Sequence, residues 1–262
     1  MGLADDDGSR FEVYVEGLAS VIGHKDREGP LRDYCLGLMM PCERKSVEPM
    51  AAVTAPGRAA AQHQSLLHFI GSGGWSDERV LAKVREMVLP QIEQHGAISA
   101  WIIDDTSFPK QGRHSVGVAR QYCGQLGKQD NCQVAVSLSL ANLHASLPVA
   151  YRLYLPQEWA NDRARRRKTG VPEEIAFKTK PEIALDQLRW ACAVGLPRGG
   201  VLDELAPIRG RQGRPAPLAE IHAADHEKRL AGVAASASQL GRISFMRPMP
   251  VRKVRSAGRA RV

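Results

Sequence analysis

The sequence has few aromatic residues, no closely spaced cysteines and no long apolar run. Phe, Trp and Tyr make up 5% of the 262 residues, although 44% are hydrophobic, which suffices for one substantial core and a smaller second one. The five cysteines form no CxxC pair, and the N-terminus lacks the basic and apolar regions of a secretion signal, so we expect a reduced, cytoplasmic protein.

Two further absences narrow the function. No stretch approaches the roughly 18–20 apolar residues that a membrane span needs, so we expect no membrane partner. The glycine-rich GSGG lacks the Lys-Ser/Thr context of a phosphate loop, which argues against a nucleotide-binding ATPase. The formal net charge is +8, and no amphipathic anchor accompanies it. This surplus favours nucleic acid over an acidic lipid surface as the partner.

Residues 1–95 predict a helical N-terminal domain. Leu66, Leu67 and Ile70 share one face of a helix that GSGG interrupts, and Ser76 is placed to cap the next helix. One interpretation is a packed helical subdomain. The other is a DNA-binding helical module, because the region carries the basic residues Arg44, Lys45 and Arg58.

Residues 96–203 change to strand-like patterns. Four runs alternate or are rich in β-branched residues, and short polar links join them, which predicts an antiparallel meander. They read AISAWIID, HSVGVARQYCG, NCQVAVSLSLA and LPVAYRLYLP. A basic loop follows, and then a helix opened by Pro181 with Ile183, Leu185, Leu188 and Ala191 on its inner face, before a short strand, GGVLD. The fold class is therefore α/β. Residues 204–262 predict a weakly ordered or disordered basic tail.

Two adjacent carboxylates end the apolar run AWII. Successive side chains of a strand point to opposite faces, so Asp104 shares the face of Ile102, and Asp105 lies across the sheet, free to cap a turn or pair with Lys110 or Arg113. A divalent cation would offset the cost of desolvating Asp104. Carboxylates from different strands that hold two ions serve in-line phosphoryl transfer. The alternative is an ordinary turn or capping signal.

A metal site needs a second carboxylate from a neighbouring strand end. Asp203 has the matching context, because it follows VL after the predicted helix that begins near Lys180. These two residues are the candidate catalytic and metal-binding positions.

Several motifs resemble those of a known family. They are RKSVEPMAAV at 44–53, HQSLLHFI at 63–70, the long run from AWIIDDTSFPK to SLSLAN at 100–142, LPVAYRLYLPQEW at 147–159 and KTGVPEEIAFKTKPEIALDQL at 168–188. Together they resemble the bacterial insertion-sequence transposases that carry a DDE-type, RNase H-like endonuclease domain. The resemblance covers roughly residues 10–202.

The resemblance implies a catalytic site and a partner. In such proteins two Asp and a third carboxylate bind two Mg²⁺ (or Mn²⁺) ions, which activate water or a 3′-hydroxyl to attack DNA. Asp104, followed by Thr106, fits the first position, and Asp203 fits the second by order. The implied partners are transposon ends and target DNA, and a homodimer is an allowed assembly.

The chain also departs from the family pattern. The expected VLxDAGYG reads VLDELAPI, so the Asp stands one residue early, and no motif after Glu204 supplies the third carboxylate. We therefore expect an incomplete RNase H-like mixed sheet in a truncated or frameshifted copy. Two functions follow as alternatives: a transposase that cuts and joins DNA, or a non-catalytic DNA-binding remnant.

Basic residues near the carboxylates are candidates for DNA contact, with a solvated surface as the alternative. Arg120 and His114 flank the acidic strand as well. Cys123 and Cys132 bracket a turn, but no convincing set of further ligands accompanies them, so we expect no zinc site. The DNA-binding candidates are Lys110, Arg113, Arg163, Arg165, Arg166, Arg167 and Lys168.

Overall fold

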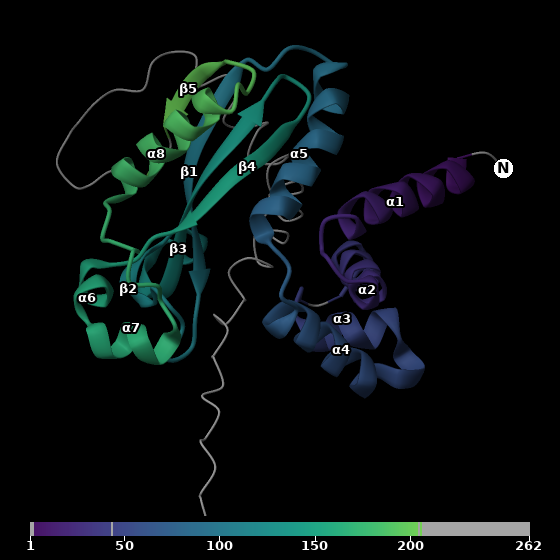
Figure 1. Cartoon of the computed structure of the whole chain (residues 1–262), viewed down its shortest axis with the longest axis horizontal. Helices are drawn as coiled ribbons and strands as arrows, with labels where there is room; N and C mark the ends of the chain where they lie inside the picture. Colours follow the sequence, from purple (N-terminus) through teal and green to yellow (C-terminus); the bar gives the residue numbers. More distant parts are fainter. Residues whose placement is uncertain (1–2, 43, 204, 206–262) are drawn as a thin grey trace, which may run out of the picture.

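The computed structural model describes residues 3–42, 44–203 and 205, and it places a group of helices before a mixed sheet (Figure 1). The helices are α1 (Leu3–Ala19), α2 (Glu28–Met39), α3 (Val47–Thr54), α4 (Ala59–Ser72), α5 (Asp77–Glu93), α6 (Gln157–Asn161), α7 (Arg163–Thr169) and α8 (Lys180–Ala193). The strands are β1 (Ala100–Pro109), β2 (Ala119–Cys123), β3 (Lys128–Ala141), β4 (Ser146–Leu153) and β5 (Gly200–Asp203). This order confirms the predicted α/β class. The predicted tail lies outside the described residues, apart from Leu205.

The N-terminal helices follow the predicted caps and stripes with one exception. Ser76 caps α5, since its Oγ accepts a hydrogen bond from the Arg79 backbone N–H at 3.3 Å. On α4, Leu66 and Ile70 are buried as predicted, but Leu67 is 48% exposed. Adjacent helical residues point about 100° apart, and the buried stripe of α4 is too narrow to include Leu67.

Helix α8 begins at a capping box. The Thr179 side chain accepts from the Glu182 backbone N–H, and the Glu182 carboxylate accepts from the Thr179 backbone N–H, a contact that lowers the pKa of Glu182. Ile183 and Ala191 are buried as predicted, but Leu185 is 44% exposed. Leu185 lies about 200° around the helix from Ile183, so it points away from the sheet.

The sheet is organised around β3. Its strand order is β2-β3-β1-β5, and β4 also pairs with β3, on the edge away from β1. Strand β5 is parallel to β1, and the other pairings are antiparallel. The meander predicted β1 beside β2. This prediction is wrong, because β1 pairs with β3. With 14 residues, β3 is long enough to pair with β2 at its start and with β1 and β4 further on.

Strand β1 does not end at the two carboxylates. It pairs with β3 without interruption from Ala100 opposite Ala141 to Pro109 opposite Cys132. This pairing outweighs the local preference of two carboxylates for a turn, so Asp104 and Asp105 lie inside the strand. The interpretation of these residues as a turn or end signal is thus wrong.

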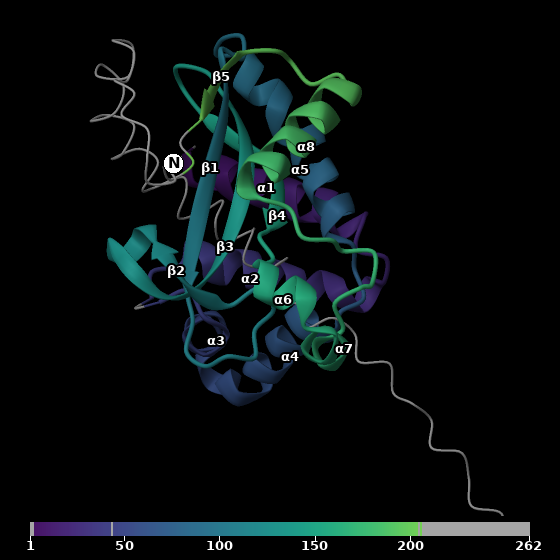
Figure 2. The ribbon, with the colours of Figure 1, turned by 90° about the vertical axis from the view of Figure 1, so that its left-hand side faces the viewer.

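One buried apolar cluster runs from the N-terminal helices into the sheet and α8. Helices α5 and α8 lie on the same side of the sheet (Figure 2), where the Arg85 guanidinium stacks 5.3 Å from the Trp190 ring centroid. The change from helices to strands near residue 95 is not a break in the core, and the boundary there stays a prediction. Among the described helices, none is long and apolar enough to cross a bilayer.

Candidate functional site

Asp104 lies in the middle of β1, in a polar row across three strands. It pairs with Ser137 of β3, which pairs in turn with Tyr151 of β4. Paired residues of neighbouring strands point to the same face, so the three side chains share one face. The Ser137 hydroxyl donates to the backbone carbonyl of Asp104 at 3.4 Å. The sequence missed Ser137 and Tyr151, because only the register brings them beside Asp104.

The negative charge of Asp104 affects the pKa of Tyr151. Burial, and to a smaller degree the Asp104 carboxylate, raises the pKa of Tyr151. The Tyr151 phenol therefore stays protonated at all ordinary pH values. It is a neutral hydrogen-bond donor on the same face as a carboxylate.

Asp105 points to the opposite face, as predicted, but its partner differs. The Lys180 ammonium at the start of α8 forms an ion pair with it, and the side chains are 24% and 11% exposed for Lys180 and Asp105. The predicted partners were Lys110 and Arg113. They are excluded from this pair because β1 continues past Asp105, which carries both basic residues further along the chain, while the N-terminus of α8 packs over Asp105.

Asp203 is beside β1 but does not share the face of Asp104. It pairs with Ile103 in the parallel register, so its side chain points to the side of Ile103 and Asp105. The β5 residue on the side of Asp104 is Leu202, which pairs with Ile102. The Asp203 carboxylate is exposed and accepts the backbone N–H of Leu205 at 3.0 Å.

The described residues do not fit a shared metal ion. Asp104 and Asp203 lie on opposite faces of the sheet, and within residues 3–42, 44–203 and 205 no three His, Cys, Asp or Glu side chains are grouped so that they could hold a metal. The glutamate at position 204 lies outside the described residues. Asp104 remains the candidate catalytic carboxylate. Asp203 is one residue away from a position whose side chain would share the face of Asp104.

The basic run at 163–168 is a helix, α7, rather than a loop. Asp162 caps it by accepting the Arg165 backbone N–H at 2.8 Å, and Gly170 ends it in the left-handed conformation. The Arg165 and Arg166 side chains turn inward onto the protein, whereas Arg163, Arg167 and Lys168 are exposed. The sequence could not separate these two groups, because both lie within a single basic run.

The two cysteines of the β2–β3 hairpin are buried together. Cys123 and Cys132 are both fully buried and pack against Val134. Burial, followed by the neighbouring Cys123, raises the pKa of Cys132 to about 12, so the thiol stays protonated. Burial in apolar surroundings and a raised pKa are typical of structural cysteines.

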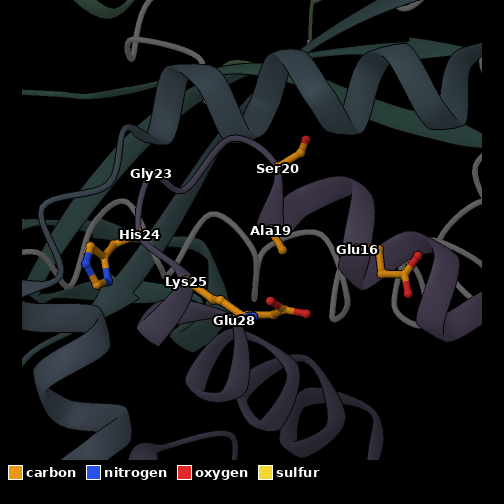
Figure 3. A pocket seen from close by; sticks show the side chains of 7 residues that line it. All are labelled: Glu16, Ala19, Ser20, Gly23, His24, Lys25 and Glu28. Carbon is orange, nitrogen blue, oxygen red and sulfur yellow. The ribbon is translucent and has the colours of Figure 1, made fainter.

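An open pocket of about 300 Å³ lies where α1 gives way to α2 (Figure 3). Glu16 and Glu28 line it together with His24, but the His24 ring already accepts the Asp26 backbone N–H and lies 3.4 Å from the Asp26 carboxylate. The polar side chains that line it are exposed, and those of Ser20 and His24 make hydrogen bonds to nearby backbone groups. Asp104 is not among the residues that line this pocket.

Comparisons with known proteins agree with the resemblance in the sequence. The sequence model of the DDE superfamily endonucleases matches residues 17–203, well over half of the chain. A curated relative from Microchaete diplosiphon, named probable transposase for insertion sequence element IS701, is 30% identical over 149 residues. These residues cover 57% of this chain and 35% of the relative, so the chain matches about a third of that protein's length. The chain belongs to the DDE superfamily endonucleases.

Proposed function

We propose that this chain is a catalytic part of an insertion-sequence transposase that cuts and rejoins DNA, with Asp104 as the carboxylate at the reaction centre. The observation that supports this most is the position of Asp104 on the central strand β1, between antiparallel β3 and parallel β5. Helix α8 makes the crossover to β5, which gives the strand order β4-β3-β1-β5. This arrangement is what an RNase H-like sheet requires of its first strands.

The proposed partners are transposon ends and target DNA. DDE superfamily endonucleases generally use divalent metals, and Mg²⁺ or Mn²⁺ is the cofactor that the resemblance implies. Asp203 belongs to this proposal by its order in the chain alone, since its side chain points away from Asp104. A homodimer also rests on the resemblance alone.

A second candidate is a non-catalytic DNA-binding protein. It is favoured by the separation of Asp104 and Asp203 onto opposite faces, and by the absence of a metal-holding group from the described part of the chain. In this case the basic surface would bind DNA without cutting it. An incomplete copy of a transposase gene would have this property.

A nicking assay separates the two candidates. Supercoiled plasmid is incubated with the protein and Mg²⁺ or Mn²⁺, and conversion to the open circle is measured. The first candidate predicts nicking that Asp104→Asn abolishes and that Glu93→Gln, a change at an exposed acid of α5, leaves intact. Circular dichroism of both variants checks that they fold.

The outcomes are distinct. Nicking that persists at full rate in Asp104→Asn contradicts the role of Asp104. An absence of nicking together with salt-sensitive DNA binding supports the non-catalytic candidate. Asp203→Asn tests the second position in the same assay, and the register predicts a smaller loss than for Asp104→Asn.

A further inference from the structure

The segment that follows β1, residues 110–118, is held to the protein by its backbone carbonyls. Side chains of β3, α6 and α7 donate to five of them. Asn131 donates to the carbonyls of Lys110 and Gly112, each at 2.7 Å, and Arg165 donates to that of Arg113 at 2.6 Å. Gln133 and Trp159 donate to the carbonyls of Val116 and Val118 at 2.5 and 2.7 Å.

These contacts fix the segment with its basic side chains outward. Arg113 and His114 are exposed, while the carbonyls around them face the protein. Gly117 allows the segment to pack closely on the protein, because its φ is +76° and a Cβ there would lie 2.8 Å from the Tyr154 carbonyl oxygen. A segment fixed in this way loses little conformational freedom when a ligand binds.

Helix α7 is fixed beside this segment by its two inward arginines. The Arg165 guanidinium stacks 3.6 Å from the Trp159 ring centroid and also holds the Arg113 carbonyl. The Arg166 guanidinium donates to four carbonyls, those of Ala160, Pro172, Glu173 and Ile175, at 3.1, 2.6, 3.2 and 2.8 Å. Both guanidinium groups therefore have structural partners.

The remaining basic residues of α7 face solvent. Arg163 and Arg167 are one turn apart on the exposed side, and Lys168 lies about 60° around the helix from Arg165, next to the side that contacts Arg113. The exposed acids near α7 are Asp162, whose carboxylate caps the helix, and Glu158, Glu173 and Glu174 in the flanking segments. The positive charge is thus concentrated on one arc, which continues from α7 to the 110–118 segment.

This arc is distant from Asp104. Helices α6 and α7 lie at the end of the sheet away from β5 in both views (Figures 1 and 2). Lys110 follows Asp104 by six residues of extended chain, which corresponds to about 20 Å, or about six base pairs at 3.4 Å each. A phosphate near the reaction centre would be out of reach of these basic residues.

We infer that the 110–118 segment and the exposed arc of α7 form one rigid surface that binds the phosphate backbone of duplex DNA about six base pairs away from Asp104. Arg113, Arg163, Arg167 and Lys168 contact phosphates. Arg165 is a positioning residue that holds both Arg113 and α7 in place. The inference rests on the proposed function for the placement of the reaction centre at Asp104, but the binding surface itself does not depend on catalysis.

The test measures binding of a fluorescent duplex by anisotropy in EDTA, over a series of KCl concentrations. Each phosphate contact contributes about 0.9 to the slope of log K against log salt, so neutralising all four contact residues to Gln should lower the slope by about 3.6. Arg79→Gln and Arg198→Gln, which remove exposed charges elsewhere, should leave it unchanged.

A double-mutant cycle tests the role of Arg165. Arg165→Met should weaken binding in the native background and weaken it less in Arg113→Gln, because part of its contribution passes through Arg113. A direct phosphate contact would instead make the two losses additive.

Three results would overturn the inference. They are a slope that the fourfold neutralisation leaves unchanged, an equal loss in the Arg79→Gln and Arg198→Gln controls, and a complete absence of duplex binding in the native protein. The nicking assay is read separately: lost DNA binding contradicts this surface, whereas nicking that is insensitive to Asp104→Asn contradicts the proposed reaction centre.

Discussion

The ion pair between Lys180 and Asp105 fixes α8 to the central strand, and its removal should destabilise the whole protein. Removing one partner of a fully buried pair costs about 3–5 kcal/mol, whereas exposed pairs contribute about 0–1 kcal/mol. The side chains of Lys180 and Asp105 are 24% and 11% exposed, which places this pair between the two limits. We therefore expect Lys180→Met to lower the free energy of unfolding by about 2–3 kcal/mol.

The two single variants should differ. In Lys180→Met the carboxylate of Asp105 stays nearly buried without its cation. In Asp105→Asn the Lys180 side chain can extend its ammonium toward water along its flexible stem, so this change should cost less, about 1 kcal/mol. Asp105 also lies near the N-terminus of α8, where a negative charge is favourable. That contribution is lost in Asp105→Asn.

Urea unfolding followed by tryptophan fluorescence measures both effects. For a chain of this size, 2–3 kcal/mol corresponds to a drop in melting temperature of roughly 4–12 °C. The double variant Lys180→Met/Asp105→Asn should recover part of the loss. Asp104→Asn is the matched control, because its side chain lies on the other face of the same strand and its effect should add to that of Lys180→Met.

The reasoning fails if Lys180→Met costs less than about 0.5 kcal/mol, which is the level of an ordinary surface substitution. It also fails if Lys180 couples to Asp104 as strongly as to Asp105. In that case the two carboxylates would not lie on opposite faces.

Three further predictions concern residues away from this pair. Arg166→Met removes a donor to four carbonyls, so it should lower the free energy of unfolding by about 2 kcal/mol, whereas Arg167→Met at the exposed neighbour should stay within about 0.5 kcal/mol in the same urea titration. Gly117→Ala should lower the melting temperature more than Gly112→Ala: both have a positive φ, but a Cβ at Gly117 meets the Tyr154 carbonyl, while nothing lies within 4 Å at Gly112. Burial raises the pKa of Cys35 to about 12. Since an unfolded thiol titrates near about 8.5, this contribution to stability is complete below that pH and is lost as the pH rises toward 12. Cys35→Ala should reduce this pH dependence of the urea midpoint, and a midpoint that responds to pH equally in both proteins would contradict it.

Much of the local structure follows from the sequence alone. Ser76 caps α5, and Thr179 with Glu182 opens α8, because capping depends on residues only a few positions apart. The period-two runs became strands, although their ends moved: β1 extends through Asp104 to Pro109, since its pairing with β3 outweighs the local preference of two carboxylates for a turn. The sequence motifs also indicated the DDE superfamily, which the family match confirms.

Tertiary structure decided the chemistry of the site. The face to which a strand residue points changes with a shift of one position. Asp203 therefore lies on the opposite face from Asp104 because it pairs with Ile103. Lys180 is 75 residues from Asp105 in the chain, and no local pattern links them. The sequence therefore determined the elements and the family, which depend on short-range patterns. The register and packing of distant segments determined which carboxylates share a face of the sheet and which arginines remain exposed to solvent.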